Sequence, residues 1–310
     1  MNKLPLTIVA AVLNEDKLLP DFLKHVRKIA DEVIVVVDYR TTDKSAVIAT
    51  KNKCKVLLDK GRSKDNVFNN KNWGIKEAKN DWVMIVDADE RLDITLQREV
   101  KKIVNGKYEP KANIYQTSFI NYEFGKLFNK SDQQQKPFVR LFKKGVFFYN
   151  TDKTAEGFGI QTASMGEETA WGKILLKIPK IRSWYIRSKR NIITLKGHLI
   201  HFTHPTIIEF IRKINHYSTR EAKILFNRNP NISKFSIIMR LIFAPSKEFV
   251  YKYFIWKLYK EGVHGFIAAY IYGVYYFLIN AKYFRYCYEN IHQKQIKKFR
   301  KKYSFPDTNI

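Results

Sequence analysis

The chain has 310 residues, enough for one large domain or two smaller ones. A hydrophobic content of 45% excludes a disordered chain, and two cysteines, Cys54 and Cys287, exclude a disulfide scaffold and fit a reducing compartment. The net charge of +27 is unevenly distributed: residues 1–100 hold 18 Lys and Arg against 16 Asp and Glu, and residues 101–310 hold 38 against 13. Only five of 45 aromatic residues lie in the first hundred positions. The sequence therefore predicts two unlike regions.

Short apolar runs alternate with helix-period segments through the first hundred residues. This alternation is typical of a parallel sheet covered by helices, so we predict a doubly wound, mostly parallel α/β fold. The predicted strands cover residues 6–13, 33–38, 55–58 and 82–87, and the predicted helices cover 18–30, 44–53, 69–78 and 95–104.

The pattern changes twice after residue 105. Strand-like segments at 114–122, 138–142 and 146–149 predict a mixed extension of the sheet, and we place them in the same domain, residues 1–204, as its second half (106–204). From Pro205 onward the apolar spacing is helical, with later helices predicted at 246–261 and 265–290. Residues 205–310 are therefore predicted to form a separate helical region that ends in a basic tail.

Polar and acidic side chains follow three of the predicted parallel strands: Asn14-Glu15, Asp38, and the run from Asp87 through Asp89 to Glu90. The carboxyl ends of parallel strands meet at one edge of a sheet, where doubly wound folds bind ligands. Carboxylates at such an edge suit a nucleotide diphosphate if Mg²⁺ or Mn²⁺ bridges the two. Each motif alone is equally typical of a helix cap, and the combination favours a metal-assisted site.

These residues resemble glycosyltransferases of family 2, which have the GT-A fold. The matching segments are 13–15, 30–36, 38–43, 70–74 and 86–91, and residues 1–105 would then be the nucleotide-sugar-binding half. Segments 140–142 and 196–202, with the helices from Phe210, resemble the lipopolysaccharide-core β-glucosyltransferase branch. Tyr39 and Arg40 differ from the small residues that the family often has after its second strand.

The resemblance implies roles for individual residues. Asp87 and Asp89 would hold a divalent metal, Mg or Mn, on the diphosphate, with Asp89 as the more direct ligand. The other implied donor-binding residues are Asn14, Glu15, Asp38, Asn72, Arg140 and His201. Arg140 is equally a candidate for an anionic acceptor or for a surface ion pair, and His198 and His204 are expected to be structural or exposed.

Inversion at the sugar requires a general base beside the acceptor hydroxyl, away from the metal. Glu156 is the candidate, because it follows the predicted 146–149 strand where the family places a Glu. The nearby alternatives are Asp152, Glu167 and Glu168, and a solvated carboxylate in a Lys-rich loop is the simpler interpretation.

The basic second region calls for an anionic partner. Nucleic acid is not expected, because no recognised binding motif occurs and the basic residues alternate with bulky apolar ones. In residues 249–260 aromatics and lysines interleave at helical spacing, as in a helix that lies in the interface of an anionic membrane. Residues 263–281 lack charged side chains, so a membrane span or a buried core helix remains an alternative. We expect a peripheral or monotopic protein at the cytoplasmic face of the inner membrane.

The sequence thus predicts a metal-dependent, inverting glycosyltransferase that moves a hexose, with glucose the first choice, from a UDP-sugar. The expected acceptor is a lipid-linked saccharide in the synthesis of lipopolysaccharide core or a related surface glycan. One alternative is a polyprenyl-phosphate glycosyltransferase, which would need no strong base. The alternative from another class is a non-catalytic, basic protein that binds membranes or nucleic acid, for which Asp87 and Asp89 would be dispensable.

Overall fold

The computed structural model describes residues 3–61, 63, 66–132, 137–149, 160–161 and 192–303, and of residues 289–303 it describes only the course of a helix. The chain divides into two compact units. The sheet unit comprises Met1–Ile120 and Gln134–Phe202, and the helical unit comprises Asn121–Gln133 and Thr203–Ile310. Residues 121–133, which the sequence pattern assigns to the first domain, therefore group with the C-terminal helices.

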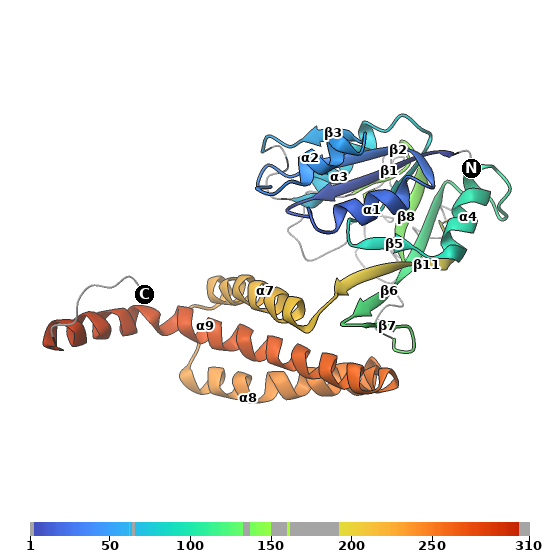
Figure 1. The fold of residues 1–310 in the computed structure, drawn as a ribbon. Helices are drawn as coiled ribbons and strands as arrows, with labels where there is room; N and C mark the ends of the chain where they lie inside the picture. The colour runs from blue at the N-terminus through green and yellow to red at the C-terminus, as the bar shows by residue number, and fades with distance from the viewer. Residues whose placement is uncertain are drawn as a thin grey trace, which may run out of the picture. The chain divides into compact units, whose positions relative to one another are not determined.

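The centre of the sheet unit is a parallel sheet of the kind that the apolar runs predict. Its strands are β1 (Leu4–Val12), β2 (Ala30–Val37), β3 (Lys55–Leu58) and β4 (Trp82–Ile85). They lie in the order β3-β2-β1-β4, of which Figure 1 labels the first three. Val9 of β1 pairs with Ile34 of β2 on one side and Ile85 of β4 on the other, all three fully buried. This order brings the ends of β2, β1 and β4 to one edge.

Helices α1 (Leu19–Val26), α2 (Ser45–Lys51), α3 (Val67–Lys76) and α4 (Ile94–Val104) cover both faces of this sheet. Alternate β1 residues such as Ile8 and Ala10 pack in one cluster with α1 and α4, while Val9 packs with α3 on the other face. At Gly74 of α3 an added Cβ would lie 2.3 Å from Val9 Cγ1, so glycine permits α3 to approach the sheet this closely.

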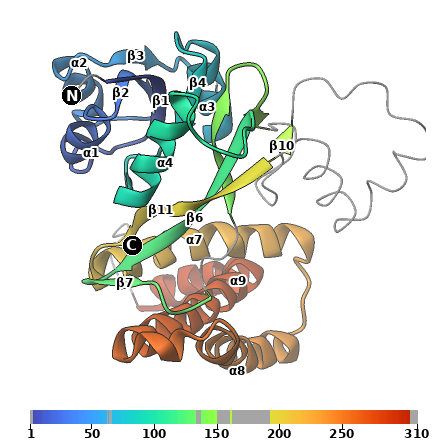
Figure 2. The same ribbon diagram turned by 90° about the vertical axis from the view of Figure 1, so that its right-hand side faces the viewer.

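An antiparallel extension continues the sheet. Beyond β4 the order runs through β8 (Phe138–Lys143), β6 (Ile114–Glu123) and β11 (Ile192–His204) to β5 (Glu90–Leu92). Figure 2 shows β6 and β11 as the long strands of this part. Strand β7 (Lys126–Phe128) pairs with β6, and β9 (Phe148–Tyr149) pairs with β10 (Ile160–Gln161). The α/β architecture predicted from the sequence is confirmed, whereas β5 was not predicted because three residues are too short to carry a strand pattern.

The helical unit contains α7 (Ile207–Arg228), α8 (Lys234–Val250) and α9 (Val263–Tyr303). The single helix predicted over 246–261 is wrong: α8 ends at Val250, a π-helical turn covers Tyr251–Ile255, and a 3₁₀ turn covers Leu258–Glu261. The break follows from the backbone, because Lys257 (φ 57°) and Gly262 (φ 65°) both adopt positive φ angles, which an α-helix does not allow.

Lys252 belongs to the segment 249–260 that was predicted to lie at a membrane interface, but it does not face outward. Its side chain is buried, with Nζ 3.1 Å from the centroid of the Trp256 ring and 3.5 Å from the carboxylate of Glu248. Burial holds the pKa of Lys252 below its ordinary value. The interleaving of lysine and aromatic residues here builds a cation–π contact inside the unit.

Candidate active site

Asp38 stands at the end of β2 at the edge where the parallel strands finish. Arg40, two residues later, binds both carboxylate oxygens through Nε (2.8 Å) and Nη2 (2.9 Å). These hydrogen bonds hold the pKa of Asp38 below its usual value. Asn70 of α3 donates to the same carboxylate at 3.5 Å. Asp38 is thus a buried, ionised group whose charge is paired with Arg40.

Asn14 and Glu15 follow β1 beside Asp38. Asn14 has a positive φ of 56°, and its side-chain oxygen accepts hydrogen bonds from the backbone N–H groups of Thr42 (2.8 Å) and Asp43 (3.3 Å). The backbone N–H of Glu15 donates to Ser45 Oγ. The two predicted donor-binding residues therefore tie the loop after β1 to the loop after β2, and the Asn14 side chain is itself exposed.

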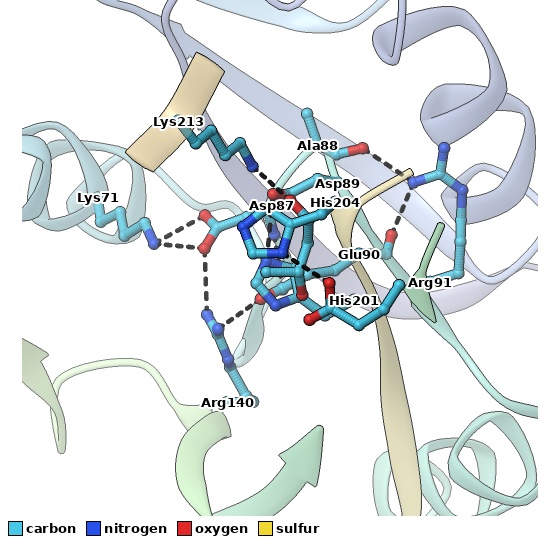
Figure 3. Close-up of polar contacts among 12 residues, drawn as sticks. Lys71, Asp87, Ala88, Asp89, Glu90, Arg91, Arg140, His201, His204 and Lys213 are labelled. Atoms are coloured by element: carbon cyan, nitrogen blue, oxygen red, sulfur yellow. Dashed lines mark hydrogen bonds and ion pairs between the residues drawn. The ribbon is translucent and has the colours of Figure 1, made fainter. Parts of the chain in front are cut away.

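Two buried cations hold Asp87, which follows β4 (Figure 3). Lys71 Nζ of α3 lies 2.7 and 2.8 Å from its two carboxylate oxygens, and Arg140 Nη1 of β8 lies 3.7 Å from one of them. Burial alone would raise the pKa of Asp87, but these two cations outweigh it and hold the pKa below its ordinary value. The charge of Asp87 is therefore already neutralised by the protein.

Glu90 lies at the base of the same cluster and is 2% exposed. It accepts from Arg140 Nη2 at 2.7 Å and, with its other oxygen, from the backbone N–H of Asp87 at 2.9 Å. Burial, with Asp87 and Asp89 close by, raises the pKa of Glu90 to about 7, against the opposing pull of Arg140. The guanidinium of Arg140 also stacks over the Phe119 ring, 5.0 Å from its centroid.

Asp89 meets His201, which comes from a strand more than a hundred residues later. The antiparallel pairing of β11 with β5 sets His201 opposite Glu90, and His201 Nε2 lies 3.2 Å from Asp89 Oδ2. Burial opposes protonation of the imidazole, but the hydrogen bond and charge of Asp89 raise the pKa of His201. Arg91 fixes the turn before β5 by donating to the carbonyls of Ala88 and Glu90 (Figure 3).

The position of β11 is set by its contacts with α4. Asp93 caps α4 through the N–H of Leu96 and accepts from the N–H of His198, while Glu99 accepts from the N–H of Gly197. At Gly197 an added Cβ would lie 2.1 Å from the backbone nitrogen of Leu96, so only glycine fits here. The seating of β11 on α4 therefore positions His201.

Replacing Gly197 by alanine is expected to destabilise the sheet unit by about 2 kcal/mol, because the new methyl group meets backbone that cannot move aside. Thermal unfolding measures this change, and Lys196→Ala at the exposed neighbouring position is the matched control. An unfolding temperature equal to that of Lys196→Ala would contradict the tight seating of β11.

The other predicted residues that the structure describes make their polar contacts with different groups. The side-chain amide of Asn72 donates to the carbonyl of Tyr149 and accepts from its N–H, so it anchors β9. His204 is buried against Glu123, 2.6 Å away, and His198 pairs with Asp93, as expected of structural histidines. The candidate base Glu156 and its alternatives Asp152, Glu167 and Glu168 lie outside the described residues.

Sequence reasoning missed Lys71, although a signal for it exists. Lys71 shares one face of α3 with Gly74 and Ile75, at three- and four-residue spacing, and all three are buried. A lysine on the core face of a helix needs a partner carboxylate, which here is Asp87.

The chemistry of these side chains fits a divalent metal only in part. Among the described residues no group of three or more His, Cys, Asp or Glu side chains is arranged to hold a metal ion. Asp87 is engaged by Lys71, whereas the side chains of Asp89 and His201 touch each other and remain 23% and 27% exposed. Carboxylate and imidazole suit Mn²⁺, and diphosphate oxygens suit the remaining positions of Mg²⁺ or Mn²⁺. The donor set therefore fits a metal shared with a nucleotide.

Comparison with known proteins agrees with the sequence motifs. An uncharacterized glycosyltransferase of Rickettsia typhi is 27% identical over 87% of this chain and 83% of its own length. The lipopolysaccharide core biosynthesis glycosyltransferase LpsC of Rhizobium meliloti is 25% identical over 90% and 92%. Among solved structures, S. aureus TarS is 12% identical, with a TM-score of 0.42 and coverage of 91% and 90%.

The family profile named "Glycosyl transferase family 2" matches residues 7–175, more than half of the chain. This match includes the ends of β1, β2 and β4 together with Lys71, Asp87, Asp89, Glu90 and Arg140, and it ends before His201. The family predicted from the motifs is confirmed: the chain belongs to glycosyl transferase family 2.

Proposed function

We propose that this glycosyltransferase uses a UDP-hexose and a divalent metal, and that it transfers the sugar with inversion. The observation that carries the proposal is the contact of Asp89 with His201 beside an Asp87 whose charge Lys71 already neutralises. Lys71 and Arg140 balance the charges of Asp87 and Glu90, while Asp89 and His201 can together bind a metal ion. This arrangement suits a diphosphate whose negative charge is shared between the protein and the metal.

In this proposal Asp89 and His201 hold the metal. Asp87, which the resemblance implies as a second metal ligand, is engaged by Lys71 through both oxygens, and with Asn14, Glu15 and Asp38 it instead holds the nucleotide side of the donor. Mg²⁺ or Mn²⁺ would act as a Lewis acid on the leaving diphosphate. Lys71 and Arg140 fix Asp87 in place, and their positive charges offset its negative charge. The carboxylate cluster therefore does not repel the donor. Glu156 would accept the proton of the acceptor hydroxyl from the opposite face of the sugar.

The proposed acceptor is a lipid-linked saccharide of lipopolysaccharide core or a related surface glycan, reached at the cytoplasmic face of the inner membrane. The 25% identity to LpsC over nearly the whole chain supports this acceptor class. The composition of the helical unit supports an anionic membrane surface, since residues 203–288 hold 13 Lys and Arg against four Asp and Glu.

Hydrolysis of a panel of nucleotide sugars by the purified protein tests the donor. With Mn²⁺ or Mg²⁺ we expect slow release of UDP from one UDP-hexose, because water replaces the missing acceptor, and no release in EDTA. Adding lipid extracts that contain truncated lipopolysaccharide should accelerate the release. Equal release with and without metal, or preference for a donor that is not a uridine nucleotide, would contradict the proposal.

A further inference from the structure

Helix α8 exposes its apolar side. Phe235, Ile238, Ile242, Phe243 and Val250 recur at helical spacing, and each is between 51% and 70% exposed. At 100° per residue these positions fall within one stripe, which we call the α8 face. The exposed side of a surface helix in a soluble protein is normally polar. A contiguous exposed apolar patch therefore marks an interaction site.

The opposite side of α8 packs inside the helical unit. Ile237 is fully buried, and α8 lies so close to α9 that a Cβ added at Gly273 would be 3.0 Å from the carbonyl oxygen of Pro245. Figure 1 shows α8 and α9 side by side along most of α8. Packing against α9 therefore fixes the orientation of α8, and the α8 face is exposed without any rearrangement of the helix.

The α8 face extends onto neighbouring segments. Phe254 and Ile255 of the π-helical turn are 55% and 61% exposed. Phe266 of α9, 48% exposed, contacts Phe249 of α8 at a ring distance of 5.6 Å. A hollow of ≈ 820 Å³ opens beside the helix, lined mainly by Met239, Phe243, Ala244, Val250, Tyr251 and Ile255.

Cations flank this apolar surface. Arg240 and Lys247, two turns apart, border the same hollow, and Lys234 stands at the start of the helix; all three are exposed. Glu248 is the one acidic residue of α8, and its side chain, 15% exposed, lies 3.5 Å from Lys252. The occupant of the α8 face must therefore be both apolar and negatively charged, as the interface of an anionic bilayer is.

Helix α9 is the alternative membrane segment, because Val263–Tyr288 is long and apolar enough to cross a bilayer, with a mean hydropathy of 1.2. Its packing argues against a span. Lys282 Nζ donates to Asn215 Oδ1 (2.7 Å), Ser218 Oγ (2.8 Å) and Thr219 Oγ1 (2.8 Å) of α7. Crossing a bilayer in this arrangement would carry α7, with its exposed Arg212 and Arg220, into hydrocarbon.

We propose that the α8 face inserts into the headgroup and upper acyl region of an anionic bilayer, with Arg240 and Lys247 on lipid phosphates. The protein is then monotopic, and α9 supports α8 from behind without crossing the membrane. This inference deepens the proposed function and rests on it, because the membrane-bound acceptor is part of that proposal. The α8 face holds the enzyme at the membrane that carries this acceptor.

Co-sedimentation with vesicles tests the α8 face. The full chain is expected to bind phosphatidylcholine vesicles that contain one quarter phosphatidylglycerol, and to bind pure phosphatidylcholine more weakly. The double variant Ile242→Ser/Phe243→Ser should bind each kind of vesicle about 25-fold more weakly, because the loss of each half-exposed apolar side chain weakens binding about fivefold. Arg240→Gln/Lys247→Gln should lose only the preference for the anionic lipid. The matched control is Ile94→Ser, at an exposed apolar residue of the sheet unit (60%).

Binding of Ile242→Ser/Phe243→Ser equal to that of the Ile94→Ser control would overturn the proposal. The same holds if the wild-type chain ignores vesicles and forms a dimer that the variant abolishes, since a second copy would then cover the α8 face. Phe235→Ser/Ile238→Ser repeats the test if the first variant fails to fold, as judged by circular dichroism. Metal-dependent UDP release without vesicles reports on the donor site alone, so failure of the donor proposal is distinguished from failure of this one.

Discussion

Replacing Asp89 by asparagine is expected to lower metal-dependent release of UDP about 10³-fold. The substitution keeps the shape of the side chain but removes the charge that would attract the metal beside His201. A Lewis acid on a diphosphate leaving group contributes several kcal/mol, and a loss of ~4 kcal/mol corresponds to about three powers of ten in rate. The rate of UDP release from the preferred donor at saturating Mn²⁺ measures the effect.

Asp43→Asn is the matched control, because Asp43 lies at the same edge of the sheet but outside the carboxylate cluster. Its oxygens accept from the backbone N–H groups of Asp16 (2.8 Å) and Ser45 (2.9 Å), which an asparagine side chain satisfies in part. This variant should release UDP at a rate close to that of the wild type. Equal rates for Asp89→Asn and Asp43→Asn would remove Asp89 from the metal site.

A binding measurement separates loss of the metal from loss of the fold. A ligand that binds only the native state raises the unfolding temperature, so UDP with Mn²⁺ should stabilise the wild type and Asp43→Asn. Asp89→Asn should unfold at the wild-type temperature without ligand and gain little from UDP with Mn²⁺. An equal gain in all three proteins would mean that the metal is held elsewhere.

The parallel core could be predicted from the sequence because each of its strands is a local apolar run and each crossover is a short helical pattern. The edge that gathers Asp38, Asp87 and Asp89 follows from that order by simple geometry. The partner of Asp89 does not follow in this way. His201 reaches it through an antiparallel pairing between residues 90–92 and 199–201, and the sequence carries no local signal for a pairing across more than a hundred residues.

The helical unit was predicted less accurately for a different reason. One predicted helix began at Ser246, directly after Pro245, yet both residues lie inside α8, which extends from Lys234 to Val250. The helix breaks after the π-helical turn, where Lys257 adopts a positive φ angle. Lysine is not typical of that conformation, so the break could not be predicted from the sequence. Lysine and aromatic residues at helical spacing predicted a membrane face, whereas Lys252 and Trp256 contact each other inside the unit.

Replacing Arg140 by methionine is expected to destabilise the protein by about 3–5 kcal/mol, the second large effect. Arg140 is 7% exposed and compensates Glu90, which is 2% exposed, as well as Asp87. Removing one partner of a buried ion pair leaves the other charge without compensation. The midpoint of urea unfolding, followed by tryptophan fluorescence, measures the change. Arg98→Met, at an exposed arginine of α4, is the matched control and should shift the midpoint little.

The cause of that loss can be isolated by a second substitution. Glu90→Gln removes the carboxylate that methionine would leave unpaired, so Arg140→Met/Glu90→Gln should be more stable than Arg140→Met alone, whereas Glu90→Gln in the wild type should be destabilising. This pattern is the signature of two residues whose energies are not additive because they contact each other at 2.7 Å. A double variant that is as unstable as the sum of its parts would place the role of Arg140 in packing against Phe119, and Asp87 would then depend on Lys71 alone for its charge balance.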